Sequence, residues 1–113
     1  NRDLLKRTLK REYEVVEADD ATQALEVLAA RHDVRVVLSD QLMPGPSGAD
    51  LARAIRARSP GLPVVIMTGY DEDPDVAAVA AAGVVEAVIP KPWQATTLRQ
   101  LLARLLARSL PAT

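Results

Sequence analysis

Residues 34–48 read VRVVLSDQLMPGPSG, and this stretch decides the fold. An apolar, β-branched run over 34–38 stops just before Asp40, and a turn rich in proline and glycine follows before helix-like sequence resumes at Ala49. Such a run is typical of a buried strand in a parallel sheet, and ligands bind at the carboxyl ends of such strands. Asp40 is therefore the first candidate functional residue. The alternative is that Asp40 only starts the turn, a position where Asp is common.

The composition is that of one domain with an aliphatic core. The chain has 113 residues, 49% of them apolar, with no Phe and one Trp. A net charge of −1 offers no basic surface to nucleic acid or an anionic membrane, and without Cys there are no disulfides or thiolate metal sites. No apolar stretch is long enough to span a bilayer and no signal peptide is visible. We therefore expect a cytoplasmic protein whose domain contacts neither membrane nor nucleic acid.

Helix and strand patterns alternate along the chain. Apolar spacing predicts helices over 3–10, 21–31, 49–57, 74–82 and 95–107, and strands over 13–18, 34–38, 63–67 and 84–89. Parallel strands joined by crossover helices follow from this order, so the predicted class is α/β with a doubly wound parallel sheet. Because the chain opens on a helix that no strand precedes, we expect a further strand upstream of Asn1. Residues 1–108 are the predicted domain, and 109–113 are a tail or the start of a linker.

Capping residues mark two of the predicted helix starts. Asp20 with Gln23 three residues later is a predicted capping box. Asp73 before Pro74 is a typical N-cap followed by proline at the first helical position, and Gly83 is the expected C-terminal cap of the same Ala-rich helix.

Three predicted strands end in Asp40, Thr68 and Lys91, and parallel strands place such ends at one edge of the sheet. A carboxylate, a hydroxyl and an ammonium group together suit a phosphate-like ligand. Lys91 is one of only three lysines beside eleven arginines, and a cation at a strand end needs an anionic partner. It precedes Pro92, so this peptide bond is a candidate for the cis form. The alternative is that Lys91 is a surface residue with only its stem packed.

Four motifs stand in a fixed order at these strand ends, and together they resemble the receiver domain of bacterial two-component response regulators. The resemblance covers the chain from the first predicted helix to the last. It implies the flavodoxin-like, (βα)5 receiver fold, with the first strand absent from this sequence. The motifs are Ser39-Asp40, Met43-Pro44 followed by Gly48, Met67-Thr68-Gly69, and Lys91-Pro92-Trp93.

The resemblance implies a role for each site residue. Asp40 would be the phosphoacceptor, which takes a phosphoryl group from a sensor histidine kinase or a phosphotransfer protein. Thr68 would donate its hydroxyl to one phosphoryl oxygen and Lys91 would pair with another. Mg²⁺ would bridge the Asp40 carboxylate and the phosphoryl group, with the backbone carbonyl of Leu42 as a further ligand.

By the same resemblance the chain is a signalling domain rather than an enzyme. It would act only on its own Asp40, by phosphotransfer and slow self-dephosphorylation, and would switch an output domain in the same chain or a protein partner. A homodimer is one assembly that the family uses.

Two departures from the family pattern bear on this reading. Receivers carry an acidic pair at the end of their first strand that completes the Mg²⁺ site, and here that pair is expected upstream of Asn1; Asp19 and Asp20 end the next strand instead. Receivers also place an aromatic residue three positions before the conserved Lys, where this chain has Val88. A small aliphatic side chain cannot signal by rotating a ring, so we expect the signal to pass through the loop after Thr68 and the Ala-rich helix.

Three minor expectations and two competing functions remain. Trp93 is expected to pack as structure, and the single His32 to lie in a loop or at a helix end. Tyr70 is either a screen for the phosphoryl group or an ordinary Tyr. The first competing function is a pseudo-receiver, an interaction or dimerisation module that is never phosphorylated. The second is a haloacid-dehalogenase-type phosphatase, which requires an Asp where this chain has Leu42.

Overall fold

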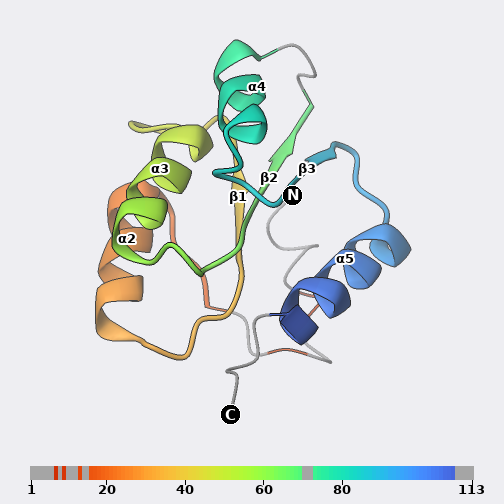
Figure 1. Ribbon diagram of the computed structural model, residues 1–113, viewed down its shortest axis with the longest axis horizontal. Coiled ribbons are helices and arrows are strands. Elements are labelled where there is room, and N and C mark those ends of the chain that lie inside the picture. Colours follow the sequence, from red (N-terminus) through yellow and green to blue (C-terminus); the bar gives the residue numbers. More distant parts are fainter. Residues whose placement is uncertain (1–6, 8, 10–12, 14–15, 70–72, 109–113) are drawn as a thin grey trace.

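The computed structural model describes residues 7, 9, 13, 16–69 and 73–108. Within them, helices and strands alternate as the sequence predicts (Figure 1). No helix in these ranges is both long and apolar enough to cross a membrane. The helices are α2 (Ala21–Ala30), α3 (Gly48–Arg58), α4 (Pro74–Ala81) and α5 (Ala95–Arg108), and the strands are β1 (Val37–Asp40), β2 (Val64–Thr68) and β3 (Ala87–Pro90).

The strands form a parallel sheet in the order β1-β2-β3. Asp40 lies opposite Met67, and Thr68 lies opposite Pro90, so the three strands end almost level. The predicted α/β class with a parallel sheet is confirmed. The strand ends that carry the candidate site residues lie at one edge, as the alternation of strands and helices requires.

Helices cover both faces of the sheet, with α2, α3 and α4 on one side and α5 on the other (Figure 1). Alternate residues of β2 point to opposite faces, as the pleat of a strand dictates. Ile66 packs with Ile55 of α3 and Val79 of α4, whereas Val65 packs with Leu98 of α5. All five residues of β2 are buried, so this strand is the centre of the described core.

The predicted caps are present, but the capping box between Asp20 and Gln23 is incomplete, because the Gln23 side chain accepts from the N–H of Asp19 and not from that of Asp20. The side chain of Asp20 accepts a hydrogen bond from the N–H of Gln23 at 2.8 Å, and Asp73 caps α4 ahead of Pro74. Gly83 follows α4 with φ of +74°, the left-handed conformation that favours glycine at a helix end. A capping box that the sequence reading did not identify, between Ser47 and Asp50, begins α3.

Two predicted strands begin later than expected, at Val37 and Ala87. The β1–β2 ladder starts where the N–H of Val37 donates to the carbonyl of Pro63, so the residues before Val37 lie outside this ladder. The predicted strand over 13–18 is wrong at residues 16–18, which form no strand. Its residues 14 and 15, most of the predicted helix over 3–10 and the tail over 109–113 lie outside the described residues.

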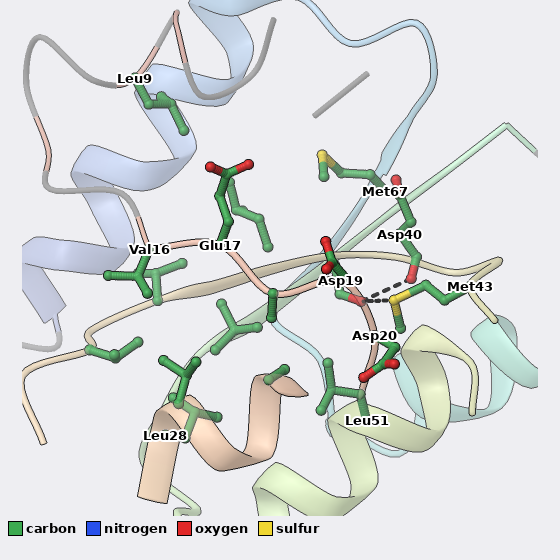
Figure 2. A pocket seen from close by; sticks show the side chains of 18 of the residues that line it. Leu9, Val16, Glu17, Asp19, Asp20, Leu28, Asp40, Met43, Leu51 and Met67 are labelled. Atoms are coloured by element: carbon green, nitrogen blue, oxygen red, sulfur yellow. Dashed lines mark hydrogen bonds between the residues drawn. The ribbon is translucent and has the colours of Figure 1, made fainter. Parts of the chain in front are cut away.

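Residues 16–18 and β1 line the same groove. Within the described part of the chain β1 pairs only with β2, and a cavity of about 610 Å³ runs along its other side. Figure 2 shows Val16, Glu17, Leu28 and Asp40 among the side chains around this groove. Residues 16–18 thus border the groove and are not part of the described sheet, β1-β2-β3.

Candidate functional site

Asp40 and Lys91 form an ion pair at the edge of the sheet. Asp40 is the last residue of β1, Lys91 directly follows β3, and the Lys91 Nζ lies 2.5 Å from the Asp40 Oδ1. The pair reaches across the end of β2, and both side chains are about two-fifths exposed. The anionic partner that the sequence analysis required for Lys91 is therefore the candidate phosphoacceptor itself. A short, charge-assisted contact of this kind orients both groups, although exposed pairs add little stability.

Thr68, the last residue of β2, is the third candidate site residue at this edge of the sheet. The residue is buried, and its carbonyl accepts a hydrogen bond from the N–H of Lys91 at 3.0 Å. A small cavity of about 270 Å³ opens at this edge, lined by Leu42, Met67, Thr68, Gly69 and Lys91. Thr68, Lys91 and Leu42 thus surround one space, and the ion pair links Asp40 to it. A space lined by an ammonium and a hydroxyl suits a small anion.

The residues after Lys91 also follow the sequence reading. The Lys91–Pro92 peptide bond is cis, as proposed from the sequence. Trp93 packs, partly buried, against the core cluster on the α5 side of the sheet, which confirms its structural role. Far from this edge, His32 lies exposed in the loop between α2 and β1, also as expected.

The loop after Asp40 folds back on the carboxyl end of β1. The N–H of Gly48 donates to the carbonyl of Gln41 at 3.0 Å, which closes the loop at its base. A Cβ atom on Gly48 would overlap the backbone carbonyl of Asp40, so only glycine fits where α3 begins. At the tip Gly45 has φ of +76°. This close approach is the physical reason for a glycine eight residues after the carboxylate.

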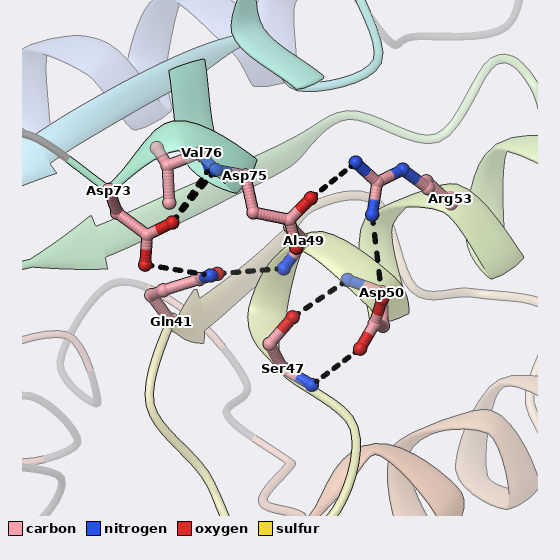
Figure 3. Close-up of polar contacts among 8 residues, drawn as sticks. All are labelled: Gln41, Ser47, Ala49, Asp50, Arg53, Asp73, Asp75 and Val76. Atoms are coloured by element: carbon pink, nitrogen blue, oxygen red, sulfur yellow. Dashed lines mark hydrogen bonds and ion pairs between the residues drawn. The ribbon is translucent and has the colours of Figure 1, made fainter. Parts of the chain in front are cut away.

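Gln41 is the functional candidate that the sequence reading missed. It directly follows Asp40 and is only 3% exposed. Its Oε1 accepts from the N–H of Ala49 in α3 at 2.8 Å, and its Nε2 donates to the Asp73 Oδ2 at 3.2 Å (Figure 3). The Oδ1 of Asp73 accepts from the N–H groups of Asp75 and Val76 in the first turn of α4. No local pattern signals a contact between positions 32 residues apart.

An ion pair and a hydrogen bond to a backbone carbonyl join α3 to the region of α4 on the surface. Arg53 pairs with Asp75 at 2.5 Å and with Asp50 at 3.4 Å (Figure 3). The hydrogen bond from Arg53 lowers the pKa of Asp75 below its usual value, and the same contact raises the pKa of Arg53. At the other end of α4, the Arg56 Nη1 donates to the carbonyl of Gly83 at 2.9 Å.

The oxygen groups present at the edge fit part of a Mg²⁺ site. Mg²⁺ prefers oxygen ligands and binds through one or two carboxylates, substrate phosphate and water. Asp40 offers a carboxylate and Leu42 a backbone carbonyl next to the small cavity. The Asp20 side chain caps α2. In the described ranges no group of three or more His, Cys, Asp or Glu residues is placed to hold a metal ion.

Val88 occupies the expected position on β3, three residues before Lys91. It lies beside Ile66 in the parallel ladder and is 38% exposed. A side chain of this size, in contact with solvent, has no ring to move between a buried and an exposed position. Tyr70, the other residue considered for this region, lies outside the described residues.

Comparisons with known proteins agree with this geometry. A family model described as the response regulator receiver domain matches residues 1–103. The response regulator protein FleR of Pseudomonas aeruginosa is 38% identical over 101 residues, which are 89% of this chain and 21% of FleR. The chain spans about a fifth of the length of FleR and of other curated relatives that it matches.

Solved structures share the fold. The receiver domain of NtrX from Brucella abortus superposes with a TM-score of 0.84 at 30% identity, over 96% of this chain and 91% of that one. The response regulator protein TrrA from Thermotoga maritima, crystallised in complex with Mg²⁺ and BeF, has a TM-score of 0.81 at 24% identity, over 93% of this chain and 89% of that one. At the latter identity only the fold is comparable.

Proposed function

Because the chain belongs to the response regulator receiver domain family, we propose that it takes a phosphoryl group onto Asp40 and thereby switches an output. The observation that carries this proposal is the Asp40–Lys91 ion pair at a strand-end cavity that Thr68 also lines. A carboxylate nucleophile must accept a negatively charged group, and so it needs a cation within reach. Lys91 is that cation.

The proposed donor is a sensor histidine kinase or a phosphotransfer protein. An Oδ atom of Asp40 attacks the phosphorus of a phosphohistidine; the O–P bond forms while the N–P bond breaks, and the imidazole leaves with the electron pair and is protonated by solvent. Lys91 moves from the carboxylate to one phosphoryl oxygen, and the Thr68 hydroxyl donates to another. Water later hydrolyses the acyl phosphate slowly, which returns Asp40 to its carboxylate form.

Asp40 and the Leu42 carbonyl are the groups of this chain that would hold Mg²⁺ beside the phosphoryl group. The bound ion supplies charge neutralisation for the phosphoryl oxygens. The remaining ligands are proposed to be an acidic pair from an upstream strand and water. Two features of this chain fit that assignment: Asp40 lines the groove along β1, and its carboxylate pairs with Lys91.

The proposed output is a further domain of the same protein or a protein partner, and the proposed location is the cytoplasm. FleR is described as a response regulator protein and is about five times as long as the matched region. We propose by analogy that this receiver also controls a separate effector, either as a monomer or as a homodimer, without itself binding nucleic acid.

A pseudo-receiver, which keeps the fold without being phosphorylated, is the alternative. It is favoured by Val88, which stands where receivers carry an aromatic residue. The retained Asp40, Thr68 and Lys91 favour phosphorylation, since a half-exposed ion pair adds little stability and is dispensable to a purely structural module.

Intact-mass spectrometry of the full-length protein decides between these functions. With Mg²⁺ and acetyl phosphate, we expect a gain of one phosphoryl mass in the wild type and in Asp33→Asn, a matched change at an exposed Asp away from the site. Asp40→Asn should show no gain. An adduct that persists in Asp40→Asn contradicts the assignment of Asp40, and no adduct in the wild type supports the pseudo-receiver. Decay of the adduct after removal of acetyl phosphate measures self-dephosphorylation.

A further inference from the structure

We propose that Gln41 is a positioning residue that couples the phosphorylation state of Asp40 to the N-terminus of α4. This inference rests on the proposed function and names the route by which the site signals. Because Val88 stands where receivers carry an aromatic residue, the signal cannot pass by rotation of a ring and needs another route. The described residues contain a continuous one, from Asp40 through the side chain of Gln41 to Asp73 and the first turn of α4.

Both the oxygen and the nitrogen of the Gln41 side-chain amide form hydrogen bonds. It is 3% exposed, and a buried amide that loses a partner is left with an uncompensated desolvation cost. The Oε1 is held by the N–H of Ala49, which fixes one end to α3. The Nε2 is then directed at Asp73, so a displacement of the Gln41 backbone reaches the Asp73 carboxylate rather than being absorbed by solvent.

The two carboxylate oxygens of Asp73 accept hydrogen bonds from different parts of the chain. Oδ1 caps α4 by accepting from Asp75 and Val76, while Oδ2 accepts from Gln41 (Figure 3). The contact from Gln41 measures 3.2 Å, at the long end of the range for N–H···O hydrogen bonds. A shift of a few tenths of an ångström at Gln41 therefore breaks it, and α4 loses one of the contacts that set the position of its first turn.

α4 is held by few packing contacts, so we expect it to shift when this hydrogen bond breaks. It has eight residues, PDVAAVAA, of which only Val76 and Val79 are buried. Its small alanine side chains leave few packing contacts to hold it against the sheet. Polar contacts with α3 and with the loop before α3 therefore help to hold α4 in position. These contacts are Gln41 with Asp73, Arg53 with Asp75, and Arg56 with Gly83.

Phosphorylation supplies the displacement. The 2.5 Å gap between Asp40 Oδ1 and Lys91 Nζ leaves no room for a phosphoryl group, so the carboxylate or the ammonium must move when one is added. The backbone of Asp40 is packed directly against Gly48, and Gln41 is tied to Gly48 by a hydrogen bond. Movement at Asp40 therefore passes to Gln41. We assign the made Gln41–Asp73 bond to the unphosphorylated state and the broken bond to the phosphorylated state.

Two variants remove this bond and keep the neighbouring contacts. Gln41→Glu retains an acceptor for Ala49 but places a carboxylate against Asp73, and Asp73→Ser retains an N-cap but lacks the second oxygen. Ser47→Ala is the matched control, because it removes a cap hydrogen bond at the start of α3 that does not reach α4. Amide hydrogen exchange of α4 and affinity for beryllofluoride with Mg²⁺ are measured on the full-length protein.

The expected results follow from the reciprocity of coupling. Beryllofluoride should speed exchange in the first turns of α4 in the wild type and in Ser47→Ala. In Gln41→Glu and Asp73→Ser exchange should be fast already, with no further response, and beryllofluoride should bind about fivefold more tightly, since the bond to be broken is gone. A purely structural role for Gln41 predicts the opposite change, weaker binding through a disturbed loop.

The outcomes separate the two proposals. If the wild type binds beryllofluoride and α4 responds equally in Gln41→Glu, the coupling is overturned while the phosphoacceptor function stands. Weaker binding in both variants also overturns it. If the wild type binds no beryllofluoride, the phosphoacceptor function fails, and the coupling, which has no signal to carry, is overturned with it.

Discussion

Lys91 Nζ lies 2.5 Å from Asp40 Oδ1, although β2 separates the two strands that carry these residues. The contact joins the outer strands of the described sheet at their carboxyl ends and places a positive charge where the proposed phosphoryl group arrives. It also means that the proposed reaction replaces one partner of Lys91 with another, rather than bringing an unpaired charge to the site.

Lys91→Met should weaken the binding of a phosphoryl mimic and change the stability of the fold only slightly. The ion pair is about two-fifths exposed on both sides, so its loss should change the free energy of unfolding by no more than about 1 kcal/mol. Affinity for beryllofluoride with Mg²⁺ should fall by more than about tenfold, because a charge-assisted contact to the phosphoryl mimic is lost. Urea unfolding and fluoride titration measure the two quantities. Unchanged affinity would remove Lys91 from the proposed site.

Gly48→Ala tests the close approach behind Asp40. The added Cβ would overlap the Asp40 carbonyl, so the loop or the start of α3 must shift, at a cost of about 1–3 kcal/mol in the free energy of unfolding. Gly61→Ala is the control, because no atom lies within 4 Å of the Cβ that it adds. Urea denaturation of both variants should show a clear loss for the first and a change near zero for the second. Equal midpoints would contradict the close approach.

The Arg53–Asp75 pair should be visible in a carboxylate titration. Arg53 holds the pKa of Asp75 below 3.8, so the stabilisation from this pair is present above that value and is lost as the pH falls through the lowered pKa. In Arg53→Gln the pKa of Asp75 should rise toward its usual value. Carboxyl carbon chemical shifts report it directly. Asp33, whose pKa is lowered by Arg31, should be unaffected and serves as the internal reference. An unchanged Asp75 would contradict the pair.

Val88 and Ile66 lie side by side in the β2–β3 ladder but differ in burial. Ile66 is fully buried, so Ile66→Ala should cost about 2–5 kcal/mol in the free energy of unfolding. Val88 is 38% exposed, so Val88→Ala should cost about 1 kcal/mol or less and leave phosphoryl uptake unchanged. Thermal unfolding and intact mass measure both effects. A loss of uptake in Val88→Ala would show that this position takes part in the switch after all.

The strand ends could be predicted because the signals for them are local. An apolar run that stops at Asp40 or Thr68 identifies a buried strand and its carboxyl end without any knowledge of the rest of the fold. The same is true of the Asp73 cap, because proline at the next position, Pro74, is typical of the first residue of a helix. Once the strands are parallel, their ends share an edge, and the pairing of Asp40 with Lys91 is a short step from that geometry.

The remaining features depend on contacts that no local pattern contains. The Gln41–Asp73 hydrogen bond joins residues 32 positions apart and exists only because α3 and α4 pack side by side. The error over residues 16–18 has a similar cause, since Val16 stands in a run with good strand propensity but is not part of the described sheet, β1-β2-β3. Strand propensity expresses fit to a neighbouring strand, and it is not realised where that neighbour is missing.

The groove along β1 has a practical consequence for handling this polypeptide. Among the described residues, the side of β1 away from β2 has no strand beside it and carries the half-buried side chains of Val37 and Leu38. An uncovered strand edge is a template for intermolecular β-structure. A polypeptide in which no further strand covers this edge should therefore become turbid with rising concentration, and one in which a strand covers it should stay clear.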